Sequence, residues 1–133
     1  MTDLRDELTA RLTRYDSLVE VGVGRRPDVA AALAAVGKEV TVTDVFDAPV
    51  PDCVTFVRDD IVERSETDPG DLYDVDAVYA LNLPAELQRP AREVAREAGA
   101  DFLFTTLGFE QPVVPVRSET LDGETLYLDV NRE

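Results

Sequence analysis

The sequence predicts one α/β domain built in three layers, with helices on both faces of a mostly parallel sheet and an antiparallel hairpin at its C-terminal edge. Short, β-branched apolar segments alternate with helical segments, which is typical of parallel strands joined by crossovers. Near the end of the chain, Asp122 and Gly123 form a turn signal between two apolar runs. The 133 residues fit a single domain spanning residues 1–133.

The expected elements can be placed in order along the chain. A helix capped by Thr2 runs to about Arg14, because leucines recur every four residues within it. A second helix begins at Pro27 and ends before Gly37, and a third runs from residue 85 or 90 to 98. The expected parallel strands are 17–21, 38–44, 54–57, 75–81 and 101–107, the hairpin strands are 113–117 and 126–130, and 65–74 is a loop.

The chain is strongly acidic, with a formal net charge of −15 and a single lysine, Lys38. A surface rich in Asp and nearly free of Lys resembles proteins of a high-salt cytoplasm, where salt screens the repulsion between like charges. The charge argues against a broad basic face for DNA or RNA. The charged N-terminus and the lack of a ~20-residue apolar run predict a cytoplasmic protein without a membrane segment.

Histidine is absent and Cys53 is the only cysteine, which limits the available chemistry. A Ser-His-Asp triad and an intrachain disulfide are excluded, and we expect no metal site. We interpret Cys53 as a packed thiol, because no His or Lys adjoins it to lower its pKa.

The strongest functional signal is Glu20-Val21-Gly22-Val23-Gly24, followed by a helix and, some twenty residues on, by Asp44. The glycines allow a tight turn and a close approach of ligand to backbone, and the helix N-terminus offers unpaired N–H groups. The acid that ends the second strand can accept hydrogen bonds from ribose hydroxyls. The combination predicts a nucleotide-like ligand at the first strand–helix turn of a Rossmann-like domain.

The glycine motif is incomplete, because Pro27 stands where a dinucleotide fingerprint has its third glycine and Arg26 where a methyltransferase has it. A simple tight turn is the alternative interpretation. Glu20, an acid at Asp60 (or Asp59) after the third strand, and the terminal hairpin favour S-adenosylmethionine over NAD. Asp44 would repel the 2′-phosphate of NADP.

Other candidate residues flank this turn. Arg25 could bind a carboxylate or phosphate as a planar fork, or it could pair with surface acids. Asn82 follows the fourth strand, where amino methyltransferases orient the target amine, although turn chemistry explains an Asn before Leu83-Pro84 equally well. Asn82 is the only catalytic candidate, and Glu86 is a nearby acid.

At Glu20 to Gly24, Asp44, Asn82 to Glu86 and the short hairpin end, the chain resembles an archaeal family of short Rossmann-like proteins, uncharacterised protein family 0146. The resemblance implies a compact methyltransferase-like fold. It implies that Glu20, Gly22, Gly24 and Asp44 match the cofactor pattern of class I S-adenosylmethionine-dependent methyltransferases, and it implies no particular reaction.

We therefore expect a protein that binds S-adenosylmethionine or a related nucleotide ligand, with a minimal methyltransferase as one form of it. The alternatives are a non-catalytic Rossmann module that acts through a nucleotide or a protein partner, and an NAD-linked enzyme. A homo-oligomer and a protein partner both stay open.

Overall fold

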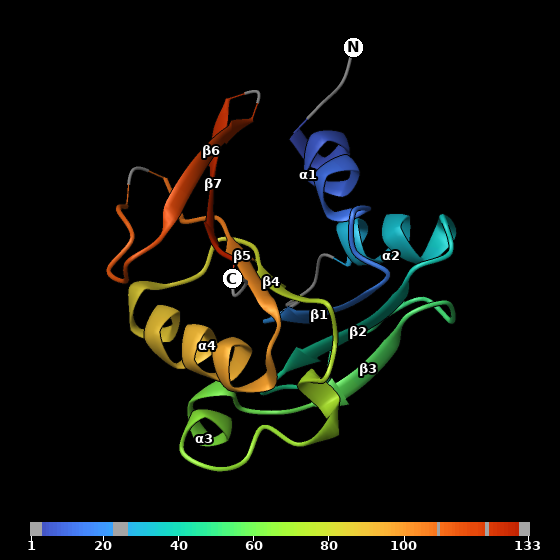
Figure 1. Cartoon of the computed structure of the whole chain (residues 1–133). Coiled ribbons are helices and arrows are strands. Elements are labelled where there is room, and N and C mark those ends of the chain that lie inside the picture. The colour runs from blue at the N-terminus through green and yellow to red at the C-terminus, as the bar shows by residue number, and fades with distance from the viewer. Residues whose placement is uncertain (1–3, 23–26, 109, 122, 131–133) are drawn as a thin grey trace.

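The computed structural model describes residues 4–22, 27–108, 110–121 and 123–130, which form one mixed sheet with helices on both faces (Figure 1). The strands are β1 (Ser17–Val21), β2 (Glu39–Asp44), β3 (Thr55–Arg58), β4 (Ala77–Ala80), β5 (Asp101–Phe104), β6 (Arg117–Leu121) and β7 (Glu124–Asp129). The helices are α1 (Leu4–Leu12), α2 (Asp28–Ala35), α3 (Ile61–Ser65), the 3₁₀ turn η1 (Asp71–Tyr73) and α4 (Ala85–Ala98).

The seven strands lie in the order β3-β2-β1-β4-β5-β7-β6. The first five pair in parallel, and β7 runs antiparallel to both β5 and β6. The chain leaves β1 toward β2 on one side and returns to pair β4 on the other, so the order reverses between β1 and β4. The predicted fold class, including the C-terminal hairpin at the edge, is confirmed.

Two apolar cores lie on the two faces of the sheet, because successive side chains of a strand point to opposite faces. Leu18 of β1 and Tyr79 of β4 pack with α1 and α2, through residues such as Leu33 of α2. Val19 and Val78, one residue away on the same strands, pack with α3 and α4. Both faces of the central strands are buried, which explains why β4 is apolar throughout and β1 is apolar except at Ser17 and Glu20.

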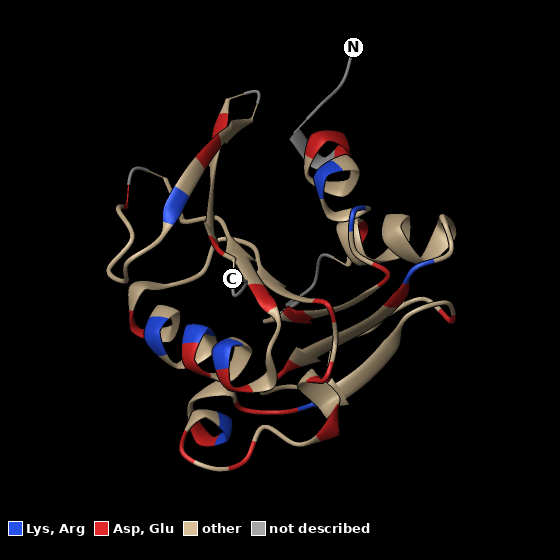
Figure 2. Ribbon diagram, in the orientation of Figure 1, with Lys and Arg blue, Asp and Glu red and all other residues tan. Residues whose placement is uncertain are grey.

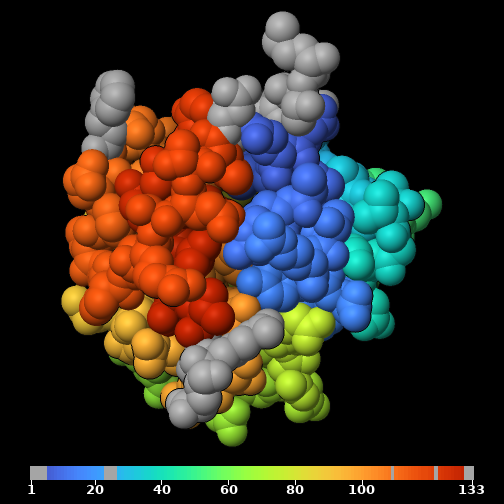
Figure 3. Space-filling model, turned by 45° about the horizontal axis from the view of Figure 1, so that its top comes forward, coloured from blue at the N-terminus to red at the C-terminus, as the bar shows by residue number. Residues whose placement is uncertain are grey.

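The C-terminal hairpin lies beside the N-terminal helix. Figure 3 shows the orange and red hairpin surface against the blue surface of α1. Nε of Arg11 on α1 lies 2.7 Å from Oε2 of Glu119 on β6, and the Tyr15 hydroxyl donates to Asp101 of β5 at 2.8 Å. The first contact joins α1 to the hairpin, and the second joins the segment after α1 to β5.

The hairpin register differs from the prediction, because β6 spans Arg117–Leu121 and residues 113–116 form no strand. Leu121 pairs with Glu124, so the turn is a two-residue connection at 122–123. A turn of that length requires the pairing strand to lie directly before it. Pro115 also has no N–H to donate to a ladder.

Two further local features were not predicted. Helix α3 begins after Asp60, whose Oδ1 accepts from the Val62 backbone N–H at 3.0 Å. The signal was present, because Asp60 followed three residues later by Glu63 is a capping-box pattern. Cys53 is exposed, so the interpretation as a packed thiol was wrong. It lies in the turn before β3, where Val54 takes the buried position instead.

No helix within the described ranges has the length and apolar character that crossing a membrane requires.

Candidate functional site

The carboxyl ends of β1 and β2 hold the predicted site residues that the structure describes. Ligands of open α/β sheets bind outside these strand ends, at the position where the strand order reverses. Here the order reverses between the neighbouring strands β1 and β4. Gly24 and Arg25 lie outside the described residues, so their predicted roles stay predictions.

Gly22 makes the turn that directly follows β1. Its backbone N–H donates to the Thr43 carbonyl of β2 at 2.9 Å, and its φ of 74° lies in the left-handed region. A side chain there would be strained. Among the described residues, apart from its neighbours along the chain, none has a heavy atom within 4 Å of the position a Cβ would occupy, so these residues leave room beside the Gly22 backbone.

Glu20 is a buried carboxyl group at the end of β1, with 2 % of its surface exposed. Its register partner on β4 is Tyr79, whose hydroxyl donates to Glu20 Oε1 at 2.8 Å. Burial raises the pKa of Glu20 to about 7, and the negative charge of Asp28 adds to this, against the opposing effect of the Tyr79 hydrogen bond. In the folded chain, this carboxyl group therefore keeps its proton to a higher pH than an exposed glutamate does.

Tyr79 is the partner that sequence reasoning missed. A signal existed, because a buried tyrosine hydroxyl needs a hydrogen-bond partner. Only the register between β1 and β4 identifies that partner as Glu20.

Asp44 ends β2 one strand away from Glu20, and its side chain is half-buried. Its Oδ1 accepts from the Phe46 backbone N–H at 3.2 Å, which forms a local turn after the strand. That turn leaves the Phe46 side chain 72 % exposed next to the carboxylate. An acid beside an exposed aromatic ring can bind hydroxyl groups and a flat apolar ring together.

The helix that follows the glycine turn begins without a side-chain cap. Pro27 occupies the N-cap position and α2 starts at Asp28, one residue later than predicted. Proline has no N–H, so the start of α2 offers fewer backbone donors than a glycine or serine would allow.

The two acids after β3 serve different contacts. Asp59 binds Arg64 through both carboxylate oxygens, at 2.9 and 3.3 Å, and accepts from the Tyr73 hydroxyl at 2.7 Å. Burial raises the pKa of Asp59, but these hydrogen bonds outweigh it and the net shift is downward. Asp60 caps α3 through one oxygen, and the structure does not test its predicted contact with adenine.

Asn82 lies at the carboxyl end of β4 in a left-handed conformation, with φ at 53°. Its N–H donates to Oγ1 of the buried Thr105, and the next N–H, of Leu83, donates to the Thr105 carbonyl, both at 2.8 Å. Thr105 is the second residue that sequence reasoning missed. Asn82 and Glu86 are both exposed at this edge.

Exposed apolar side chains gather at the same edge. Of the six large apolar residues that are exposed within the described chain, four follow the carboxyl ends of strands: Val45 and Phe46 after β2, Val62 after β3 and Leu107 after β5.

Two solved structures have a similar fold. An RNA methyltransferase from Salinibacter ruber, in complex with S-adenosyl-L-homocysteine, is 19% identical with a TM-score of 0.64, and the match covers 96% of this chain and 91% of that one. The 1,6-didemethyltoxoflavin-N1-methyltransferase from Burkholderia thailandensis, with bound S-adenosylhomocysteine, is 22% identical with a TM-score of 0.52, over 95% and 59% of the two chains. At these identities the likeness shows a methyltransferase-like Rossmann fold.

Sequence relatives are closer. A UPF0146 protein of Halobacterium salinarum is 51% identical over 110 residues, which is 82% of each chain. A UPF0146 protein of Archaeoglobus fulgidus is 39% identical over 91 residues, 68% of this chain and 67% of that one. Residues 1–130 match the family as a whole, so the chain belongs to the Uncharacterised protein family (UPF0146).

Proposed function

We propose that this chain binds S-adenosylmethionine, or its demethylated product S-adenosylhomocysteine, at the carboxyl ends of β1 and β2. One observation carries the proposal: Glu20 lies one residue before the end of β1, Gly22 directly follows β1 and Asp44 ends the adjacent β2, next to the point where the strand order reverses.

The described residues suit the parts of this ligand. The ligand's ammonium group would compensate the buried charge of Glu20, whose desolvation the Tyr79 hydrogen bond offsets only in part. Asp44 would accept hydrogen bonds from the two ribose hydroxyls. Val45 and Phe46 offer an apolar surface for the adenine ring. When bound, S-adenosylmethionine supplies an electrophilic methyl group, and Asn82 is the exposed polar residue at the end of β4 that would orient an acceptor.

The similar structures support the same ligand. Both the Salinibacter and the Burkholderia methyltransferases were solved with S-adenosylhomocysteine. The Salinibacter chain is matched over 91% of its length, so a domain of nearly this size can carry that ligand.

Thermal unfolding in molar KCl tests the proposal directly, with S-adenosylmethionine, S-adenosylhomocysteine, NAD and ATP added separately. A ligand at one hundred times its Kd stabilises a protein by about 2.7 kcal/mol, which raises Tm by a few degrees for a domain of this size. We expect that rise with the first two ligands only. No rise with either of them would contradict the proposal and favour a non-catalytic module.

Asp44→Asn locates the binding site. The amide oxygen can still accept from the Phe46 N–H, so the local turn should survive, while the negative charge next to the ribose is lost. We expect at least tenfold weaker binding of S-adenosylhomocysteine. Asp52→Asn is the matched control, because Asp52 is an exposed acid in the loop before β3, at the opposite edge of the sheet. Equal affinities of the two variants for S-adenosylhomocysteine would show that Asp44 does not bind the ligand.

A further inference from the structure

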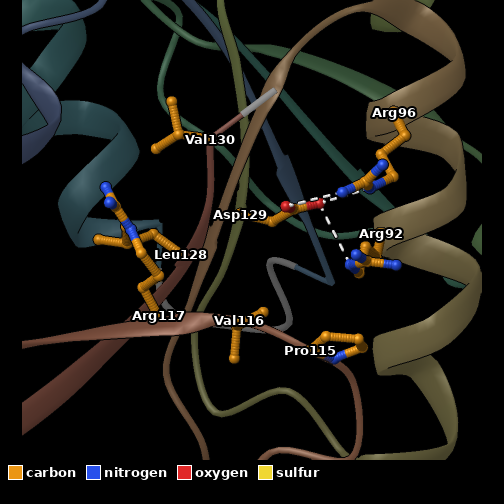
Figure 4. A pocket seen from close by; sticks show the side chains of 8 residues that line it. All are labelled: Arg92, Arg96, Pro115, Val116, Arg117, Leu128, Asp129 and Val130. Carbon is orange, nitrogen blue, oxygen red and sulfur yellow. Dashed lines mark hydrogen bonds and ion pairs between the residues drawn. The ribbon is translucent and has the colours of Figure 1, made fainter. Parts of the chain in front are cut away.

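A hollow of about 490 Å³ lies between α4 and the hairpin strands, away from the proposed ligand site (Figure 4). Its charged lining consists of Arg92, Arg96, Arg117 and Asp129, and Pro115 and Val116 contribute an apolar wall. Asp129 ends β7 and pairs with Phe102 near the amino end of β5. The hollow therefore lies near the amino ends of the parallel strands, whereas Glu20 and Asp44 lie near their carboxyl ends.

One carboxylate serves two guanidinium groups in this hollow. Arg96 donates from Nε to Asp129 Oδ2 at 2.8 Å and from Nη2 to Oδ1 at 3.2 Å. Nε of Arg92 lies 3.1 Å from the same Oδ2 but makes no hydrogen bond, although it is buried. Figure 4 shows both arginines reaching from α4 to Asp129, with Arg117 on the other side of Asp129 in this view.

Arginines outnumber acids in the described lining of the hollow. Three arginines (Arg92, Arg96 and Arg117) and one aspartate line it, in a chain whose net charge is −15. The Arg92 side chain is only 17% exposed, so water screens its charge poorly. Arg117 forms no ion pair with any residue that the structure describes. Fastening α4 to β7 requires one arginine, and a second on the same oxygen adds repulsion and desolvation cost.

Helix α4 places its arginines on one side. Arg89, Arg92 and Arg96 follow the i, i+3, i+7 spacing of a helix face, and they appear as blue bands along α4 in Figure 2. Arg92 and Arg96 line the hollow, whereas Arg89 is exposed and does not line it.

We propose that this hollow binds the phosphate group of a small molecule, with Arg92 as the main contact. Guanidinium groups bind phosphate oxygens through paired, charge-assisted hydrogen bonds, and a bound phosphate would accept the hydrogen bond that the buried Nε of Arg92 does not make within the described chain. The size of the hollow and the apolar wall suit a small organic phosphate. A nucleic acid strand would meet repulsion from the acidic remainder of the surface. The proposal is independent of S-adenosylmethionine binding.

The test measures Tm in KCl as potassium phosphate replaces KCl at constant ionic strength, at the lowest salt at which the chain stays folded. We expect the wild type and the control Arg89→Gln to gain Tm equally with phosphate. Arg92→Gln should bind phosphate about tenfold more weakly, which is the effect of losing one charged hydrogen bond. An equal gain in Arg92→Gln, or no gain in the wild type, overturns the proposal.

A structural role for Arg92 gives a different result. If Arg92 only fastens α4 to β7, Arg92→Gln should lose several degrees of Tm in buffer without phosphate, and that loss would contradict the proposal. We expect its Tm there to equal or exceed that of the wild type, because a surplus cation is removed. Arg92→Lys is a second variant, because it keeps the charge without the planar fork. It should also bind phosphate more weakly than Arg89→Gln does, and equal binding would contradict the proposal.

Three probes distinguish the sources of phosphate. Tighter binding of phenyl phosphate than of inorganic phosphate supports an organic ligand that uses the apolar wall, and the reverse order supports free phosphate. Tighter binding of a single-stranded uridine oligonucleotide than of either would overturn the choice of a small anion.

Discussion

Replacing Glu20 by Gln should make the free energy of unfolding less dependent on pH. The Gln carbonyl can still accept the Tyr79 hydrogen bond, so the contact between β1 and β4 is kept. What the variant removes is a carboxyl group that burial makes costly to ionise, with 2 % of its surface exposed.

The size and sign of the effect follow from the pKa of Glu20. Raising it from 4.5 to about 7 costs the ionised form about 3 kcal/mol. The folded chain holds this proton more tightly than the unfolded chain, so the wild type is stabilised below pH 4.5 and loses that stability as pH rises toward 7. Glu20→Gln has no carboxyl group to ionise, so its stability does not fall in this way as pH rises. The stability of the variant relative to the wild type should therefore rise by about 3 kcal/mol between pH 4.5 and pH 8.

The assay is urea unfolding of both proteins at fixed KCl concentration and at several pH values across that range. The buried Gln amide adds donors without known partners, at a cost of about 1–3 kcal/mol that does not depend on pH. The quantity to compare is therefore how the difference in unfolding free energy between variant and wild type changes with pH. The size of that difference at a single pH does not test the reasoning. The m-value should stay constant, which shows that the same surface is exposed on unfolding.

A difference that stays flat with pH would refute the reasoning. Glu20 would then ionise in the folded chain as easily as in water, and its burial would carry no cost. The same variant should bind S-adenosylhomocysteine more weakly than the wild type near neutral pH, so a variant that keeps its stability as pH rises would be a poorer binder. A variant that gained stability and kept its affinity would leave Glu20 a structural residue.

Three further predictions concern the same edge of the sheet. Wild-type affinity for S-adenosylhomocysteine should rise with pH up to about 7 and then level off, because the ligand ammonium favours ionised Glu20; calorimetric titration of Glu20→Gln should show no such rise. Tyr79→Phe should cost about 1–3 kcal/mol in urea unfolding at pH 8 and less at pH 5, because only ionised Glu20 depends strongly on that hydrogen bond. Asn82→Ala should cost about 1–2 kcal/mol, because its φ of 53° is strained for alanine, whereas Asn82→Gly should be as stable as the wild type and lose any methyl transfer that Asn82 supports.

Much of the candidate site could be located from sequence because its signals are local. A glycine turn after a buried strand and an acid at the end of the next strand lie within one βαβ unit. Parallel strands then carry Glu20 and Asp44 to the same edge. The positions of Gly24 and Arg25 stay predictions.

The errors arose where a distant partner or a turn decides the outcome. Residues 113–117 have the composition of a strand. Because the connection at 122–123 has only two residues, the strand that pairs with β7 lies directly before it, at Arg117–Leu121. Asp59 and Asp60 are equivalent as sequence, yet Arg64 and Tyr73 hold one and the start of α3 holds the other.

The sequence by itself determined the alternation of strands and helices, the acidic surface, the glycine turn and the family, because periodicity, composition and short motifs depend on neighbours along the chain. Only the tertiary structure decided that Tyr79 binds Glu20, that Thr105 holds Asn82, and that Arg92 and Arg96 share one carboxylate. Those contacts join residues from separate elements, and their pairing and their cost depend on burial and distance, which follow from how the strands pack.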